Sequence, residues 1–480
     1  MNNGSGSIAQ AVPAMSVPAP GAARTRLLLE GPIVSTLLRL AAPNIVVNVV
    51  LIAVTATVDA HFVGQVGPDA LAGLSLVFPL IMLMQQMANS SMGGALASAI
   101  ARAIGAGRHA DATALIVHGM VVATGMAAIF ASVLLIGGPA IYKLMGGAGE
   151  THAAALEYSN AIFAGALAYW LLSTLTSVVR GTGQATVLAV VYLAAEALHI
   201  LLVPVLMFGM GPLPPLGITG AGMATVASFT ASSAVLAWYL ASGRTAIRLS
   251  LRGVRLNRRL FIEILRVGAP MSLQPILNNL ALATLTGFVA SLGAAQLAGF
   301  GAAVRLEYLL YPIAFGLGAG VLAIVGTNIG AGNFARAGRV TWTAAALAVG
   351  VTGCIGLFGA TLPGAWTGLF TKVPEVHVLA AHYLVIVSLA YPFLGLGLTL
   401  TSAFQAAGRP LWPLLGITSR AVVVAVGGWI AIHLTGTDLI ELALVAASGL
   451  IVYGASLTIG FRAGVWQSPR VQTSPGVRRV

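Results

Sequence analysis

Charged residues are scarce in this chain of 480 residues. The 12 acidic and 24 basic residues together make up 8% of the sequence. A typical soluble domain has about 25% charged residues. Apolar residues account for 58% of the chain, and the mean hydropathy is +0.94. A water-soluble fold could not bury this much apolar surface, so the composition excludes a soluble enzyme, a secreted scaffold and a disordered regulator.

Cysteine and the common catalytic motifs are also missing or nearly so. The single cysteine, Cys354, excludes a disulfide framework and a thiolate metal cluster. The sequence contains no GxxxxGKS/T loop for a nucleotide, no GxSxG turn for a nucleophilic serine and no HExxH metal motif. We therefore expect no enzymatic activity, no cofactor and no bound metal other than a possible sodium ion, and an ATP-driven pump is disfavoured.

Long apolar runs fill most of the chain. A membrane-spanning helix needs about 20 apolar residues, and these runs are too long and continuous for the alternating strands of a barrel. We therefore expect an all-α polytopic membrane protein with 12 transmembrane helices. The runs lie near 33–63, 71–100, 112–137, 153–178, 184–209, 219–241, 267–291, 297–326, 340–361, 377–403, 411–434 and 440–461.

The basic residues predict how these helices are oriented. If the N-terminus is cytoplasmic, 20 arginines fall on the cytoplasmic side, whereas the outer loops hold only Lys143 and Lys372. Cytoplasmic segments of membrane proteins collect Lys and Arg, so we expect both termini in the cytoplasm. Because the arginines are spread over all cytoplasmic connections and tails, the net charge of +12 indicates topology rather than nucleic-acid binding.

Paired motifs indicate an internal duplication with a constant offset of 225 to 227 residues. Each half has six helices, so both halves start on the same side of the membrane. Such repeats form two six-helix lobes related by a pseudo-twofold axis along the membrane normal. The pairs are LAAP (40–43) with VGAP (267–270), DALAG (69–73) with AQLAG (295–299), IGAGRHADA (104–112) with IGAGNFARA (329–337), and RGTGQA (180–185) with QAAGRP (405–410).

The repeat and the composition together predict the domain organisation. It comprises a disordered cytoplasmic tail at 1–32, an N-terminal lobe at 33–241, a cytoplasmic linker at 242–266, a C-terminal lobe at 267–462 and a second tail at 463–480.

A polar stripe runs along the first helix. Asn44, Asn48, Thr55 and Asp59 recur at helical spacing and are expected to face the bundle interior. Ionisable groups inside apolar helices are costly and usually functional, and burial favours the protonated form of a carboxyl group. Asp59 is therefore a candidate proton carrier or, with neighbouring amide and hydroxyl oxygens, a Na⁺ ligand. A structural hydrogen bond between helices is the alternative, and Pro43 permits a bend.

Two other carboxylates lie within predicted spans. Tyr192, Glu196 and His199 share one face of the fifth helix, so they form a second proton site, a group that binds a cationic substrate, or a mutually satisfied buried cluster. Glu307 is expected to pair with a basic residue on another helix, and Arg420 is the candidate partner.

The seventh helix is the repeat partner of the first but differs in chemistry. It carries Gln274 and Asn278, and Thr286 occupies the position equivalent to Asp59. We assign ion coupling to Asp59, Glu196 and His199. We assign the substrate cavity to Asn44, Asn48, Thr55, Tyr192, Gln274, Asn278 and Glu307.

Over about residues 33–462 the chain resembles the multidrug and toxic compound extrusion (MATE) transporters. The order and spacing of several motifs carry the resemblance. They are AAPN (41–44), VDAHFVGQVGPDALAGLSL (58–76), ARAIGAGRHADA (101–112), RGTGQA (180–185), FGMGPLPPLGITGAG (208–222), VGTNIGAGNFARA (325–337) and FQAAGRP (404–410).

The resemblance implies a secondary antiporter with two lobes around a V-shaped cleft, in which organic cations leave the cell as H⁺ or Na⁺ enters. The family's first-helix acid matches Asp59. In the archaeal and DinF-like branches this acid works with an Asn and an Asp on the fifth helix, and the matching positions here are His199 and Val203. Glu196 is the candidate replacement for the missing acid.

The NorM-like branch uses acids on the seventh and tenth helices. The seventh-helix position matches Asn278, and the tenth helix has no acid. At its ion site the chain therefore resembles the DinF-like branch more closely than the NorM-like branch, with the proton as the coupling ion.

These observations predict an antiporter of the bacterial inner membrane that exports organic cations or amphipathic drugs by alternating access. Its expected partners are these small molecules, H⁺ or Na⁺ and the lipid bilayer, without nucleic acid, and we expect a monomer. A lipid-linked oligosaccharide flippase of the same superfamily is the alternative. It is disfavoured because only Arg305 and Arg420 lie within spans.

Overall fold

The computed structural model describes residues 20–210, 214–243, 245, 247–250, 254–434 and 438–467, without the side chains of 20–22, 51–56 and 434. Within these residues all regular structure is helical, which confirms the predicted all-α fold. The first half contains α1 (Pro20–Glu30), α2 (Ile33–Val66), α3 (Pro68–Gln86), the π-helix η1 (Met87–Met92), α4 (Gly93–Gly105), α5 (His109–Leu144), α6 (Gly149–Ala164), α7 (Ala166–Gly181), α8 (Ala185–Phe208) and α9 (Gly217–Ala241). The second half contains α10 (Arg258–Leu292), α11 (Ala294–Tyr308), α12 (Leu310–Gly330), α13 (Phe334–Thr361), α14 (Pro363–Thr367), α15 (Pro374–Ser388), α16 (Tyr391–Ala406), α17 (Leu411–Leu434) and α18 (Leu439–Arg462).

The helices account for the predicted membrane spans. In the described part of the chain, 10 helical segments are long and apolar enough to cross a membrane. The pairs α6–α7 and α15–α16 qualify as bent spans, with bends of 48° and 51°, which brings the number to 12. The two bent spans are the fourth and the tenth, so they occupy equivalent positions in the two halves. The protein is therefore an integral membrane protein with the expected number of spans.

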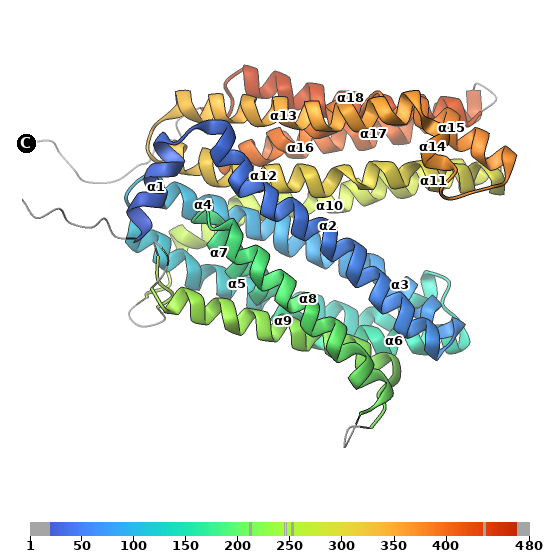
Figure 1. Cartoon of the computed structure of the whole chain (residues 1–480), viewed down its shortest axis with the longest axis horizontal. Coiled ribbons are helices and arrows are strands. Elements are labelled where there is room, and N and C mark those ends of the chain that lie inside the picture. The colour runs from blue at the N-terminus through green and yellow to red at the C-terminus, as the bar shows by residue number, and fades with distance from the viewer. Residues whose placement is uncertain are drawn as a thin grey trace, which may run out of the picture.

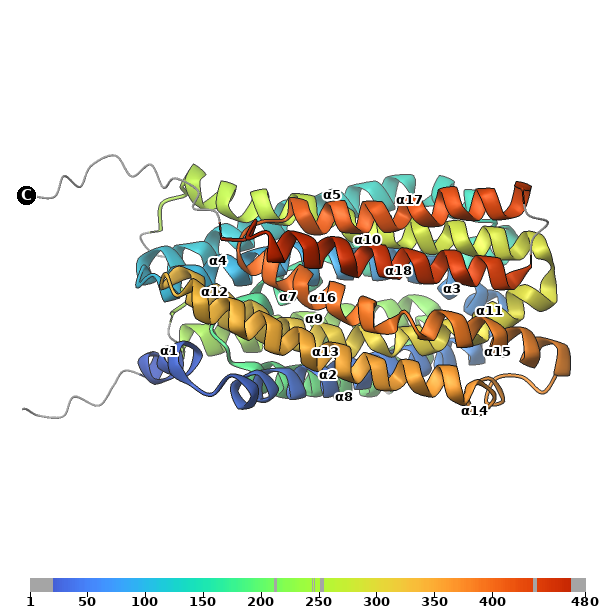
Figure 2. The ribbon, with the colours of Figure 1, turned by 90° about the horizontal axis from the view of Figure 1, so that it is seen from above.

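The two halves of the chain form separate groups of helices (Figure 1). In this view α2–α9 lie in the lower part and α10–α18 in the upper part. The groups are closest at the end where α1 lies, which we call the terminus end, and they diverge toward the end that holds α6 and α14. Figure 2 shows the same helices from above, running along the long axis of the molecule.

Two glycines at the terminus end reveal the pseudo-twofold relation between the halves. A Cβ on Gly105 of α4 would lie 1.9 Å from the Thr327 carbonyl oxygen of α12, and a Cβ on Gly330 of α12 would lie 2.1 Å from the Arg102 carbonyl oxygen of α4. The repeat offset of 225 exchanges these two contacts. Glycine permits this close approach of two helix backbones, as small residues do at helix interfaces in membranes.

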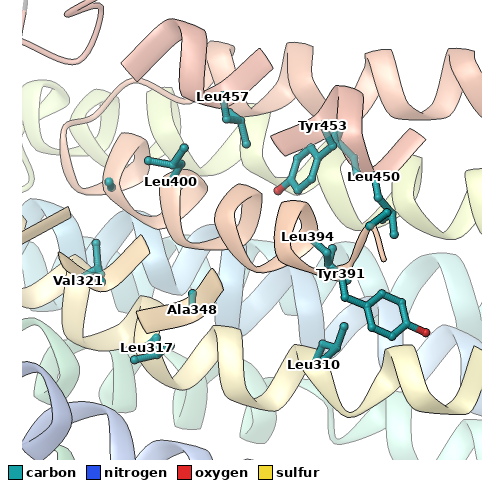
Figure 3. Close-up of a cluster of buried hydrophobic side chains, with 14 of the residues drawn as sticks. Leu310, Leu317, Val321, Ala348, Tyr391, Leu394, Leu400, Leu450, Tyr453 and Leu457 are labelled. Atoms are coloured by element: carbon teal, nitrogen blue, oxygen red, sulfur yellow. The ribbon is translucent and has the colours of Figure 1, made fainter. Parts of the chain in front are cut away.

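A large apolar cluster fills the second half. In Figure 3, α16 contributes Leu394 and Leu400 between Leu317 of α12 on one side and Leu457 of α18 on the other. Tyr453 of α18 is 2% exposed, and its hydroxyl lies 2.8 Å from the Thr401 hydroxyl of α16. This packing holds the second group of helices together as one lobe.

The predicted N-terminal tail was wrong for residues 20–30, which form α1. The segment RLLLE places Leu28 at 2% exposure, and its carbonyl accepts a hydrogen bond from the Asn328 amide of α12 at 3.1 Å. The side-chain amide therefore provides a tertiary anchor that local composition does not reveal. The remaining tail residues, 1–19 and 468–480, lie outside the described part of the chain.

The predicted linker at 242–266 is also shorter than expected, because α10 begins at Arg258. The Asn257 side chain accepts a hydrogen bond from the Arg259 backbone N–H at 2.8 Å. Such an N-cap satisfies a backbone donor that the first helical turn leaves free. The helix therefore starts at this cap, nine residues before the apolar run.

Candidate functional site

Asp59 lies in α2 and is 8% exposed. One carboxylate oxygen, Oδ1, lies 2.9 Å from Nε2 of His199 on α8. The other, Oδ2, accepts a hydrogen bond from the Tyr158 hydroxyl of α6 at 3.5 Å, a long and therefore weak contact. Three helices, α2, α6 and α8, thus each bring a polar group to one buried point of the first lobe.

His199 is the second member of this buried pair. Its side chain is 3% exposed, and its Nδ1 atom has no hydrogen-bond partner among the described residues. Since Nε2 faces the Asp59 carboxylate, Nδ1 is the ring atom available for a second proton. Carboxylates and imidazoles are both groups that bind protons, so this contact is a candidate proton site.

The other residues predicted on the fifth helix lie on the same side of α8. Glu196 is 8% exposed and precedes His199 by three residues, so it belongs to the same helix face. Tyr192 is half-buried. The structure brings His199 into hydrogen-bond distance of Asp59.

The residues of the polar stripe on the first helix differ in their contacts. Asn44 donates its side-chain amide to the Leu40 carbonyl of its own helix at 2.8 Å, next to Pro43. Asn48 is half-buried, and the side chain of Thr55 lies outside the described residues. Asp59 is thus the member of the stripe that the structure connects to α6 and α8.

The second lobe holds a different carboxylate cluster. The predicted pairing is confirmed, because Nη2 of Arg420 on α17 lies 3.4 Å from Oε1 of Glu307 on α11. The same oxygen accepts from the Tyr311 hydroxyl at 3.4 Å, and Nη1 of Arg420 donates to Oδ1 of Asn278 at 3.1 Å. Gln274 lies nearer the start of α10 and contacts the Met271 sulfur at 3.3 Å.

A small cavity adjoins this second cluster. It has a volume of about 20 Å³, and Glu307, Tyr383 and Arg420 contribute its polar lining. A cavity of this size can hold one water molecule. Arginine keeps its charge at every physiological pH, so Glu307 has a permanent counter-ion, whereas the partner of Asp59 is an imidazole.

Tyr158 is the contact that sequence reasoning missed. It precedes Tyr383 by the repeat offset of 225, and both tyrosines are buried on equivalent helices, α6 and α15. Each lies in the same lobe as a buried carboxylate, Tyr158 beside Asp59 and Tyr383 on the cavity of Glu307. A search for polar residues retained in both halves would have identified this pair.

Comparison with known proteins gives one family and one fold. The MatE family model matches residues 44–205 and, separately, residues 270–430. The FAD transporter of Shewanella oneidensis is 26% identical over 400 residues, which cover 83% of this chain and 87% of that protein. The multidrug export protein MepA of Staphylococcus aureus is 23% identical over 402 residues, with 83% and 87% coverage.

Solved structures of similar architecture are also found. The crystal structure of MATE in the bent conformation has a TM-score of 0.84 at 24% identity and covers 92% of this chain and 98% of that chain. A MOP superfamily transporter from Pyrococcus furiosus has a TM-score of 0.83 at 23% identity, with 93% and 99% coverage. These structures support the fold of two six-helix lobes.

Proposed function

Because the chain belongs to the MatE family, whose members are transporters rather than enzymes, we propose that it is a proton-coupled antiporter that exports organic cations or amphipathic drugs. The observation that carries this proposal is the buried Asp59–His199 pair of the first lobe. It joins a carboxylate to a titratable base at a point where a proton and a cationic substrate would compete for the same negative charge.

The partners of Asp59 favour the proton over Na⁺ as the coupling ion. Hard metal cations are bound by carboxylate, carbonyl and water oxygens. The nearest partner of the carboxylate is instead an imidazole nitrogen at 2.9 Å, and the second is a phenol at 3.5 Å. A histidine in this place can itself take the coupling proton. The site thereby resembles the DinF-like arrangement, in which an amide side chain occupies the position of His199. Glu196 is the candidate for the second carboxylate of that arrangement.

The charge of the Asp59–His199 pair changes with the number of bound protons, and the proposed transport cycle follows from this change. With Asp59 ionised and His199 neutral, the pair carries one negative charge and attracts a cation. One proton neutralises the pair, and a second makes it positive. Two unit charges about 4 Å apart interact by about 4 kcal/mol at an effective dielectric of 20, so proton uptake strongly disfavours a bound cation. Each charge that crosses a potential of 100 mV supplies about 2.3 kcal/mol.

In the proposed cycle, helix α2 converts the change in charge of the Asp59–His199 pair into a movement of the helix. Pro43 lies inside α2, where it removes one backbone hydrogen bond and permits a bend. In the proposed cycle, protonation of Asp59 shifts or bends α2 near Pro43 and expels the substrate from the first lobe. Asn44, Asn48, Thr55, Tyr192, Gln274, Asn278 and Glu307 are the proposed substrate contacts.

The setting of the cycle is proposed from the charges. The arginines concentrate in segments on one side of the spans, so we place both termini in the cytoplasm of a bacterial cell and the chain in its inner membrane, as a monomer. The lobes at 33–241 and 267–462 would move as the two units of alternating access. The relatives reported above give no support to a flippase.

Transport by purified protein in liposomes tests this proposal. We expect export of a fluorescent organic cation to follow an imposed pH gradient, and Asp59→Asn and His199→Gln to abolish it. Glu157→Gln is the matched control, because Glu157 is an exposed carboxylate next to Tyr158. FAD serves as an anionic comparison substrate.

Export that persists in Asp59→Asn would contradict the coupling role of the pair. Export that follows a Na⁺ gradient alone would contradict the choice of ion. If export is lost in Asp59→Asn but fully retained in His199→Gln, Asp59 carries the proton without His199. Glu196 then becomes the next candidate for its partner.

A further inference from the structure

The π-helix η1 interrupts the second span where the two lobes meet. It covers Met87–Met92 between α3 and α4. A π-helical turn shifts the backbone hydrogen bonds by one residue, and such turns occur frequently at functional sites. The equivalent residues of the second half, 312–317, belong to the ordinary helix α12. Within the described residues, the π turn is therefore a feature of the first half alone.

Side chains from both lobes bind this one segment. From the first lobe, Nη2 of Arg180 donates to Oδ1 of Asn89 at 2.6 Å. From the second lobe, Nε2 of Gln405 donates to the carbonyl oxygens of Ser90 at 2.8 Å and Ser91 at 3.3 Å. The π turn thus accepts hydrogen bonds from a helix end in each lobe.

The two donors are equivalent positions of the internal repeat. Arg180 and Gln405 differ by 225 residues, and each lies in the last turn of its helix, α7 or α16. The pseudo-twofold axis therefore directs both side chains toward the same place, and η1 occupies it. The bond from Arg180 stays within the first lobe, whereas the bond from Gln405 joins the lobes.

Two neighbouring contacts strengthen the junction. The Ser91 hydroxyl donates to the Met271 carbonyl of α10 at 3.0 Å, so η1 is bonded to a second helix of the other lobe. Arg102 donates to the carbonyl of Ala406, the residue after Gln405, at 2.8 Å. These contacts join η1 and α4 of the first lobe to α10 and α16 of the second lobe.

We propose that η1 and Gln405 form a latch that holds the two lobes together at the terminus end. The Gln405 amide binds carbonyls of the π turn, and this bond must break before the protein opens toward that end. The latch concerns the balance between the two conformations and is separate from the proton site at Asp59.

A distance measurement between the lobes tests the latch. Ser242 and Ala463 are exposed and follow α9 of the first lobe and α18 of the second. Spin labels on Ser242→Cys and Ala463→Cys, in a Cys354→Ser background, report the separation of the lobes by pulsed electron paramagnetic resonance. No substrate or ion gradient is needed, so a failure of the latch and a failure of the proposed coupling role are distinguishable.

Two variants weaken the latch, one by a change in each lobe. Gln405→Leu removes the amide donor. Gly94→Ala leaves Gln405 unchanged but would place a Cβ 2.5 Å from its Nε2 atom, which must then move away from the carbonyls. Because one net hydrogen bond contributes about 1 kcal/mol, we expect the ratio of open to closed molecules to rise about fivefold in each variant.

Thr399→Val is the matched control on α16. It removes a buried hydroxyl that donates to the Gly395 carbonyl of its own helix at 2.8 Å. We expect its distance distribution to equal that of the parent. The latch is overturned if Gln405→Leu and Gly94→Ala both leave the distribution unchanged, or if Thr399→Val changes it as much as they do. Gly94→Ala preserves the test should Gln405→Leu fail to fold.

Discussion

Two buried carboxylates, Asp59 and Glu307, illustrate how a single partner sets the role of a residue. Asp59 faces the imidazole of His199, and Glu307 faces the guanidinium of Arg420. The first partner can lose its charge and the second cannot. In the proposed cycle the first pair takes up and releases protons. The second pair combines one negative with one permanent positive charge, which suits a structural or substrate-contacting role.

This difference predicts unequal effects of neutralising the two acids. Glu307→Gln leaves the Arg420 charge buried without its counter-ion, which typically costs about 3–5 kcal/mol. Asp59→Asn costs much less, because His199 can stay neutral. Thermal unfolding in detergent measures both variants. The double variant Glu307→Gln/Arg420→Gln is the control and should recover most of the stability, and equal melting temperatures for the two single variants would contradict the assignment.

At the scale of helices, α4 and α12 determine how the lobes meet. They cross so closely that Gly105 and Gly330 each lie against a backbone carbonyl of the other helix. The adjacent π turn η1 then presents its carbonyls to α16. The backbones of α4 and α12 pack closely against each other, and the proposed latch adds directional hydrogen bonds between Gln405 and η1. The two features together make the terminus end the firmer junction in this conformation.

The close crossing of α4 and α12 predicts that one added methyl group at Gly105 strongly lowers the stability of the protein. Gly105→Ala would place a Cβ 1.9 Å from the Thr327 carbonyl oxygen, so the two helices must separate. Overpacking of this kind typically costs about 1–3 kcal/mol, and a rigid backbone partner favours the upper end. We expect a lower melting temperature and a larger open fraction in the spin-label experiment.

Gly125→Ala on α5 is the control for this change, because no atom lies within 4 Å of the added Cβ. It should leave stability unchanged or slightly raised, since alanine favours a helix more than glycine. A Gly105→Ala protein as stable and as closed as the Gly125→Ala protein would refute the importance of the crossing.

At the scale of the molecule, the duplication creates two lobes of one architecture with unequal chemistry. The repeat retains Tyr158 and Tyr383 at equivalent places, but the acid moves from α2 in the first lobe to α11 in the second. The π turn likewise occurs in one half only. In the proposed mechanism, the symmetric pair of lobes supports alternating access, while the asymmetric features give one lobe the proposed coupling site and one span the proposed latch.

The proposed orientation predicts which loops face the outside. Ala148 follows α5 near Lys143, and Ala106 follows α4; both are exposed. In a Cys354→Ser background, an impermeant maleimide should label Ala148→Cys in intact cells. It should label Ala106→Cys only after the cells are broken. The reverse pattern would invert the orientation, and with it the direction of transport.

The sequence by itself determined the number and kind of spans and the duplication, and it singled out Asp59 as a carboxylate within a span. These features rest on local properties, because a span is a run of apolar residues and a costly charge within it stands out. The repeat offset also sufficed to relate Arg180 to Gln405. The motifs likewise led to the correct family.

Only the tertiary structure decided which side chains meet. Both Glu196 and His199 lie on the same face of α8, but the packing of α8 against α2 brings the His199 ring to the carboxylate of Asp59. Tyr158 joins them from α6, and Gln405 reaches η1 across 314 residues of sequence. Helix rotation and crossing angle set such contacts, and both depend on the packing of whole surfaces rather than on any local pattern.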